Sequence, residues 1–420
     1  MEFKVHKTEN EIEDICIAYG MCKILEDNNV EYRLKDELSM FVIYTDEFNL
    51  EDLEWFGIET DEISSFISSS FKKFEIDNNN VALNNFFEDK NNLVNTFKFY
   101  LGEETENFKP KKVKGIFIGT GFYTLGIRGG QDKKAYETLE QKRYLAFLGW
   151  VYTVSYCKNK SIETTILLKP KDTDQLIRCF YLTYVDKKTG QIKNLTTLRD
   201  NTETEIESQI YLKTLKEYNN LKDNYSKVYF IRQTQAGNKP LANITYSIDV
   251  NTLSNCLIDE MLPKITFSNT DKDVKDVTSK FILDIKNYSK LSKVIRVYSK
   301  KNQKLSTKSL KELLEMQTER VQEIFGNESL KILGKGLKRL LDNKAGYEVQ
   351  VALYNVRNTR SLLKAIRLEL SVYTKNYQKV LLNSNQLENI INSIKTNKEA
   401  EIFADVILGY SKVFFDKKED

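Results

Sequence analysis

Apolar positions in the first hundred residues predict a helix followed by a hairpin. From Glu11 to Asp27 they recur with helical spacing, and two short runs at 30–34 and 39–44 continue or alternate as strands do. A polar pair between the runs is a natural place for a tight turn. Short helical segments follow, and three asparagines at 78–80 interrupt them. We expect residues 1–106 to form an α/β domain.

The middle of the chain has the pattern of strands. Strands are expected at 115–119, 162–168, 176–185, 227–232 and 244–250. The last two can pair across the turn Gly237-Asn238. Helices are expected at 136–157, which is rich in aromatic residues, and at 204–218. Together these elements predict a β-rich middle domain over residues 107–300.

Helical spacing dominates from about Ser306 to the C-terminus. Amphipathic helices are expected at 347–356, 359–379, 387–395 and 400–415. Short amphipathic helices joined by tight polar breaks are typical of a helical bundle, which we place at residues 301–420. The predicted fold class is therefore α+β, with an acidic α/β N-terminal domain, a mixed β-rich middle domain and a C-terminal helical bundle.

The composition excludes several classes of site. The 420 residues include one histidine, His6, so a Ser-His-Asp triad or a two-histidine zinc site is not expected. The five cysteines contain no C-x-x-C pair and are odd in number, which fits neither a disulfide framework nor a thiolate metal site. We expect no metal, no other cofactor and a reducing cytoplasmic location. No apolar run is long enough for a membrane span, and the acidic start is unlike a signal peptide.

Charge is sorted along the chain. Residues 1–100 hold 9 Lys and Arg against 22 Asp and Glu, whereas residues 280–380 hold 22 against 9. A strongly basic segment is the electrostatic footprint of a polyanion-binding protein, and nucleic acid is the leading partner class. An AT-rich genome would raise the lysine content everywhere, but it does not explain the separation of acidic from basic segments.

A glycine-rich loop at 119–134 follows the basic connector 109–114. Ile127 and Arg128 stand where a phosphate-binding P-loop needs Lys and Ser or Thr, and Thr124 stands where a dinucleotide site needs Gly. The remaining mixture of cations, an amide and aromatics suits contact with DNA grooves and phosphates. The alternative is an ordinary surface loop. The candidate DNA-contacting residues here are Lys109, Lys111, Lys112, Lys114, Phe122, Tyr123, Arg128, Gln131, Lys133 and Lys134.

Two predicted C-terminal helices each carry a basic stripe beside an apolar one. At about 100° per residue, the cations of each stripe fall on one helix face. Two adjacent stripes could form a groove for a phosphate backbone, bound without regard to sequence. The alternative is a pair of ordinary solvated helix faces. The stripes comprise Lys331, Lys335, Lys338 and Arg339 in the first helix and Arg357, Arg360, Lys364 and Arg367 in the second.

One pattern suggests a nuclease instead. Asp284 and Lys286, with Asp271, Asp273 and Asp276 upstream, match the arrangement in which carboxylates hold Mg²⁺ and a lysine assists phosphodiester hydrolysis. Asp-x-Lys is common by chance in so charged a chain.

Four segments of the chain carry a resemblance to a known family. They are Asp14-Ile-Cys-Ile-Ala-Tyr-Gly20 before the hairpin, Gly334-Lys-Gly-Leu-Lys-Arg-Leu-Leu341, Tyr354-Asn-Val-Arg-Asn-Thr-Arg-Ser-Leu-Leu363 and Ala404-Asp-Val-Ile-Leu-Gly-Tyr410. Together they resemble the large subunit of type I CRISPR surveillance complexes (Cascade). The cysteine-rich zinc insertion of several relatives has no counterpart here, so the subtype is open.

The resemblance implies a non-enzymatic subunit of an RNA-guided antiviral complex. Such a subunit checks the protospacer-adjacent motif of target DNA and contacts the guide RNA and the backbone subunits. Its C-terminal bundle stabilises the displaced strand of the R-loop and helps to recruit the effector helicase-nuclease. The glycine-rich loop would be the motif sensor and the basic stripes the strand-binding face. The alternatives are the Mg²⁺-dependent nuclease and a structural or replication protein of a mobile element.

Overall fold

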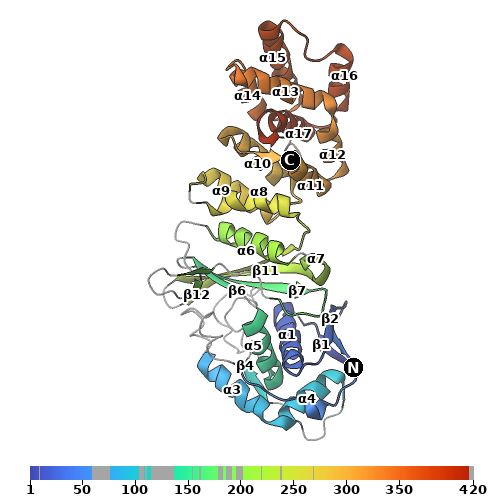
Figure 1. Cartoon of the computed structure of the whole chain (residues 1–420), viewed down its shortest axis with the longest axis vertical. Helices are drawn as coiled ribbons and strands as arrows, with labels where there is room; N and C mark the ends of the chain where they lie inside the picture. The colour runs from blue at the N-terminus through green and yellow to red at the C-terminus, as the bar shows by residue number, and fades with distance from the viewer. Residues whose placement is uncertain are drawn as a thin grey trace. The chain divides into compact units, whose positions relative to one another are not determined.

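The computed structural model forms two compact units, Met1–Thr252 and Leu253–Asp420 (Figure 1). Its fold is α+β, as predicted, with several small sheets and a helical C-terminal region. The boundaries predicted from the sequence lie instead after residues 106 and 300. The structure describes residues 1–415 apart from 9, 59–75, 104–107, 109–110, 115–136, 154, 160–161, 178–182, 186–191, 195–201, 219, 237–238 and 268.

The first unit begins with a four-stranded sheet next to the first helix. Helix α1 (Glu11–Asp27) has the predicted bounds, and the predicted hairpin forms from β2 (Tyr32–Asp36) and β3 (Met40–Thr45). Two strands that were not predicted complete the sheet in the order β1-β3-β2-β8. These are β1 (Glu2–His6) and β8 (Asp172–Thr173).

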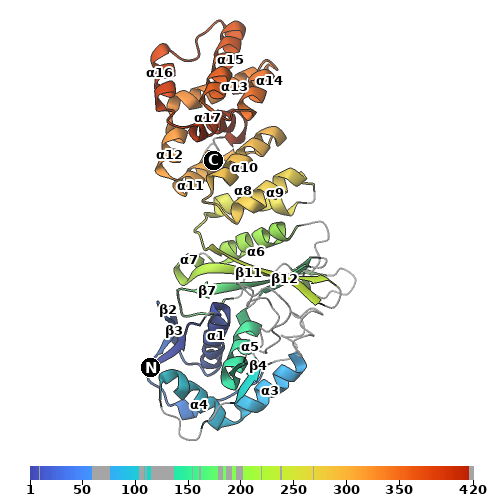
Figure 2. The same cartoon turned by 180° about the vertical axis from the view of Figure 1, so that it is seen from behind.

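A second antiparallel sheet has the order β12-β11-β7-β6. The predicted hairpin is confirmed, because Lys227 lies opposite Asp249 and Arg232 lies opposite Ile244. Helices cover both faces of this sheet, α6 on one side and α1 with α5 on the other (Figures 1 and 2). The strands are β6 (Ser155–Asn159), β7 (Ile162–Pro170), β11 (Tyr225–Ala236) and β12 (Lys239–Asp249), and the further helices are α5 (Glu140–Thr153) and α6 (Glu203–Glu217).

Alternate side chains of β11 bind the helices on opposite faces of the sheet. The Arg232 guanidinium donates to the buried Glu207 carboxylate of α6, with Nε 2.6 Å from Oε1. The Tyr229 hydroxyl donates to Glu11 of α1, which also pairs with Lys169 of β7. These polar contacts tie the sheet to both helix layers.

Two glycines let α1 and α5 cross with their backbones in contact. A Cβ at Gly20 would overlap the carbonyl oxygen of Leu145, and one at Gly149 would overlap that of Cys16. Tyr19, the residue before Gly20, donates its hydroxyl to the Leu168 carbonyl of β7 at 2.7 Å. The Tyr-Gly step therefore joins α1 to a helix on one side and to a strand on the other.

One of the remaining described elements of this unit, α3, differs from the prediction. Helix α3 runs through the asparagines at 78–80, where a break was predicted, because Leu83 and Phe87 on the same helix are buried and outweigh the low helix propensity of Asn. The elements are η1 (Leu50–Asp52), α3 (Ile76–Glu88), α4 (Lys90–Leu101), β4 (Lys112–Lys114), β5 (Glu137–Leu139), β9 (Thr183–Val185), β10 (Ile192–Asn194) and α7 (Leu221–Asn224).

The second unit is helical from Asn255 onward, about fifty residues before the predicted start. Its first three helices are α8 (Asn255–Thr266), α9 (Lys272–Ile282) and α10 (Tyr288–Lys301). Side-chain contacts join these three helices to the later helices of the unit. Ser254 at the start of α8 binds the Glu312 carboxylate of α11, with its backbone nitrogen 2.6 Å away.

The predicted bundle helices are present, but α14 and α15 end two residues before the predicted ends, and α16 and α17 begin three residues before the predicted starts. Asparagine caps form reciprocal capping boxes at the starts of α15 and α16. Among the described residues, no helix is long and apolar enough to cross a membrane. The elements are β13 (Leu305–Ser306), α11 (Thr307–Glu315), α12 (Glu319–Gly326), α13 (Glu328–Asp342), α14 (Tyr347–Tyr354), α15 (Thr359–Tyr377), α16 (Ser384–Ser393), α17 (Asn397–Leu408), the π-helical turn η3 (Gly409–Val413) and β14 (Phe414–Phe415).

A buried ion pair joins α10 to α17 within this unit. The Asp405 carboxylate is fully buried and accepts from Arg296 Nε at 2.7 Å, from Ser292 at 2.6 Å and from Tyr288 at 2.9 Å. Burial by itself lowers the pKa of Arg296, but the charge and hydrogen bond of Asp405 more than offset this and raise it. Arg296 therefore stays charged, and its charge is balanced by Asp405.

Candidate nucleic-acid interface

The basic stripe of α15 lies on an exposed helix face. Arg360, Lys364 and Arg367 follow one another at helical spacing, and Arg357 lies just before the N-cap residue of the helix. All four side chains are exposed, and none forms an ion pair with a described residue. The opposite face of α15 is buried, and its core residues are Leu362, Ala365, Ile366 and Tyr373.

Helix α15 itself carries no exposed carboxylate. Glu369 is the only acidic residue of the helix, and it is fully buried on the core face. Burial raises the pKa of its carboxyl group well above the usual range, which favours the neutral acid. Lys375, which the sequence analysis did not single out, is exposed and falls on the same face as Lys364. All the charged side chains on the outward face of α15 are therefore cations.

The cations of α13 lie in different surroundings from one another. Lys331 pairs with Glu328 at 2.5 Å and lowers the pKa of that carboxyl group. Arg339 donates through Nη1 to the Tyr373 hydroxyl of α15 at 3.1 Å. Lys335 and Lys338 are exposed. Only part of the predicted α13 stripe is therefore available to a ligand.

The two stripes do not form the groove that the sequence analysis expected. Besides Tyr373, the Tyr377 hydroxyl of α15 binds α13, donating to the Arg339 carbonyl at 2.9 Å. At about 100° per residue, the stripe of Arg360, Lys364 and Arg367 lies on the other side of α15 from these contacts. It points away from α13, so the two stripes lie on different surfaces.

Lys338 instead gathers with lysines that the sequence analysis did not single out. The Lys304 side-chain amine donates to the Lys412 carbonyl of η3. Burial lowers the pKa of Lys304, and the nearby charges of Lys338 and Lys412 lower it further. These lysines come from three segments far apart in sequence, so helical spacing alone did not reveal the cluster.

The basic connector is only partly described. Lys111 and Lys112 are exposed, and β4, which contains Lys112 and Lys114, pairs with β5. The other candidates of the connector and the glycine-rich loop lie outside the described residues. These are Lys109, Phe122, Tyr123, Arg128, Gln131, Lys133 and Lys134.

The acidic residues of the alternative nuclease site are kept apart. Asp271 and Asp273 lie at the start of α9 and pair with Lys301 at 2.7 and 3.3 Å. Asp284 follows the other end of this helix, which is about 15 Å away at 1.5 Å per residue.

Asp284 is also bound by neighbouring side chains. Burial by itself raises its pKa, but bonds from Lys290 and Asn287, each at 2.9 Å, bring the pKa below the usual value. In the described part of the chain, no three His, Cys, Asp or Glu side chains lie close enough to hold a metal ion.

Residues that carry the resemblance meet in the helical unit. Gly334 and Tyr410 come from two separate segments, and a Cβ added at Gly334 would lie 2.6 Å from the Cβ of Tyr410. No protein-family model matches the chain, and a comparison with curated proteins finds no match. The similarity to type I large subunits therefore stays a prediction from these segments.

Proposed function

We propose that this chain is a nucleic-acid-binding scaffold that holds a single strand on the outward face of α15. The observation that carries the proposal is the row of Arg360, Lys364 and Arg367, exposed and without ion pairs to described residues, above a buried Glu369. Such a row binds successive phosphates without reading bases.

The two units differ in net charge, and this difference supports strand binding by the second unit. Residues 253–420 hold 30 Lys and Arg against 21 Asp and Glu, whereas residues 1–252 hold 33 against 39. The helical unit would attract a polyanion, and the first unit would suit a basic protein partner better.

The resemblance to the CRISPR large subunit narrows the proposal. In that role the chain would act in the cytoplasm, within an antiviral complex that contains guide RNA, target DNA and backbone subunits. Base pairing with the guide would supply most of the sequence discrimination. The α15 face would hold the displaced strand, and the loop at 119–134 would check the protospacer-adjacent motif before the effector helicase-nuclease is recruited.

Charge reversal on α15 tests strand binding. The variant R360E/K364E/R367E should bind a fluorescent thymidine oligomer at least about tenfold more weakly than the unchanged chain in low salt. Its affinities for oligomers of different sequence should fall about equally, because phosphates lack sequence information. Fluorescence anisotropy measures both effects.

A matched control separates this site from net charge. The variant K308E/K311E/K398E makes the same change in charge at exposed lysines of α11 and α17. It should keep most of the affinity. An equal loss in the two variants would show that binding follows overall charge, and unchanged binding in the α15 variant would refute the proposed face.

A further inference from the structure

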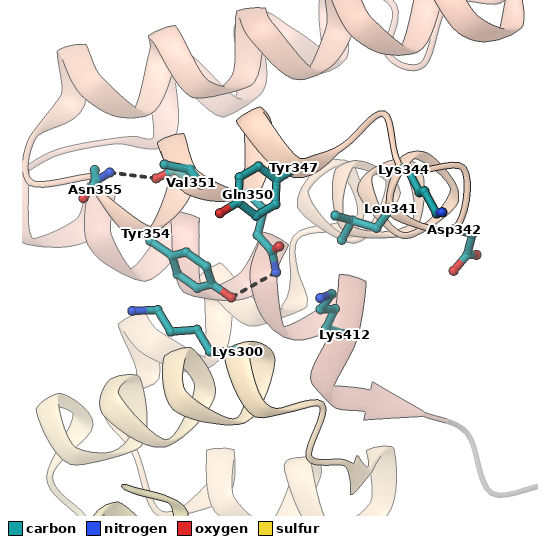
Figure 3. Close-up of a pocket in the computed structure, with 10 residues that line it drawn as sticks. All are labelled: Lys300, Leu341, Asp342, Lys344, Tyr347, Gln350, Val351, Tyr354, Asn355 and Lys412. Atoms are coloured by element: carbon teal, nitrogen blue, oxygen red, sulfur yellow. Dashed lines mark hydrogen bonds between the residues drawn. The ribbon is translucent and has the colours of Figure 1, made fainter.

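A pocket of about 720 Å³ lies within the helical unit, between α10, the end of α13, α14 and η3. Figure 3 shows the side chains of Lys300, Lys344 and Lys412 coming from three separate segments around it. The only carboxylate among the lining residues is Asp342. The lining is therefore cationic and is built from elements that meet only in the folded unit.

Further lysines add to this charge. Lys304 donates to the Lys412 carbonyl. Burial lowers the pKa of Lys304 most, the charges of Lys338 and Lys412 lower it further, and Asp342 offsets only part of this effect. Lysines held close together repel one another, and a bound anion would relieve this repulsion. The cluster thus favours a ligand with more than one negative charge.

The lining also provides aromatic and amide groups. Tyr347 is 69% exposed, which leaves its ring open to stacking against a base. Deeper in the pocket, the nearly buried Gln350 donates to the Tyr354 hydroxyl at 2.9 Å, and the Lys300 amine lies 4.8 Å from the centre of the Tyr354 ring (Figure 3). The Tyr354 hydroxyl donates in turn to Ser299 at 3.0 Å. Tyr347, Gln350 and Tyr354 therefore form one row along α14, with the polar pair fixed beside the exposed ring.

The backbone at Lys344 is unusual for a lysine. Its φ is +62°, a left-handed conformation that glycine adopts freely and that is typical of the residue after a helix. A non-glycine residue is strained in this conformation. The strained position keeps an amine at the edge of the pocket where glycine would fit better.

We propose that this pocket binds a phosphorylated nucleotide, with its phosphates on the lysines and its base against Tyr347. The nucleotide is either free or the phosphorylated end of a strand, since both present the same groups. The inference does not depend on strand binding by α15.

Calorimetric titration of the full chain with ATP, with sodium tripolyphosphate and with tetrathymidylate with and without a 5′-phosphate tests the proposal. ATP, or the 5′-phosphorylated tetrathymidylate, should bind about tenfold or more tightly than tripolyphosphate, because base stacking adds to the phosphate contacts. If ATP alone binds, the ligand is a free nucleotide. Preference for the phosphorylated oligomer over the unphosphorylated one indicates a strand end.

Three substitutions locate the site. Lys344→Gly relieves backbone strain and removes an amine, so it should weaken ATP binding about fivefold or more without lowering stability. Lys412→Gln should weaken it similarly, and Tyr347→Ala should reduce ATP affinity to that of tripolyphosphate.

Three results would refute nucleotide binding in this pocket. One is the absence of binding by every probe. Another is tripolyphosphate binding as tightly as the nucleotide with no effect of Tyr347→Ala, which indicates a simple anion patch. The third is loss of ATP affinity in the α15 charge-reversal variant, which would assign binding to that helix.

Discussion

Replacing Asp405 with alanine is expected to lower the free energy of unfolding of the helical unit by about 3–5 kcal/mol. The substitution leaves Arg296 charged and 16% exposed without its main partner, and it removes the acceptor for Ser292 and Tyr288. Hydrogen exchange of α10 and α17 with urea present measures the loss. Both tryptophans, Trp55 and Trp150, lie in residues 1–252, so their fluorescence provides an internal reference.

A double variant distinguishes an unpaired charge from a packing defect. Asp405→Leu together with Arg296→Met removes both charges and keeps apolar volume, so it should recover most of the stability lost in Asp405→Ala. If the double variant is as unstable as the single one, the ion pair is not the cause. A loss below about 1 kcal/mol in Asp405→Ala would show that water reaches Arg296.

Adding a methyl group at Gly149 should destabilise the first unit by about 3 kcal/mol or more. In Gly149→Ala the new Cβ would overlap the Cys16 carbonyl and would lie 2.7 Å from the Gly20 nitrogen. Both are backbone atoms, so no side-chain rotation relieves the overlap and the helices must separate. Urea unfolding followed by the fluorescence of Trp150, which lies on α5, reports on this contact.

Gly326 offers a matched control. It ends α12, and a Cβ built there meets no atom within 4 Å. Gly326→Ala should change stability by less than about 1 kcal/mol, because alanine only reduces the freedom of the unfolded chain. Gly326 lies in the second unit, so hydrogen exchange of α12 measures its effect. A comparable loss there would mean that alanine at a helical glycine is costly without any overlap, and a loss below about 1 kcal/mol in Gly149→Ala would contradict the close approach of α1 and α5.

Local patterns predicted those elements whose own residues specify them. Helix α1 combines a sustained apolar face with Asn10 as its N-cap, and the predicted and observed bounds agree. The strand β1 was not predicted, although Phe3 and Val5 alternate with exposed residues. The alternation of apolar and polar residues over Glu2–His6 was the pattern from which this strand could have been predicted.

Features that depend on contacts between residues far apart in sequence could not be predicted from local patterns. Asp405 is charged and so suggests a surface position, yet α17 is buried on nearly all sides and the partner Arg296 lies 109 residues away. The lysine pocket likewise unites α10, the α13–α14 turn and η3. Spacing within one helix placed Arg360, Lys364 and Arg367 on one face, but Arg357, predicted to share it, precedes the N-cap Asn358. Spacing also could not show that this face points away from α13.

The salt dependence of strand binding tests the central claim most directly. For the full chain and a thymidine oligomer of about 30 nucleotides, each phosphate neutralised adds about −0.7 to the slope of log affinity against log salt concentration. Four engaged cations on and beside α15 therefore predict a slope of about −3, reduced toward zero in R360E/K364E/R367E. A slope near zero for the unchanged chain, or no binding at about 50 mM salt, would contradict a cationic strand-binding face.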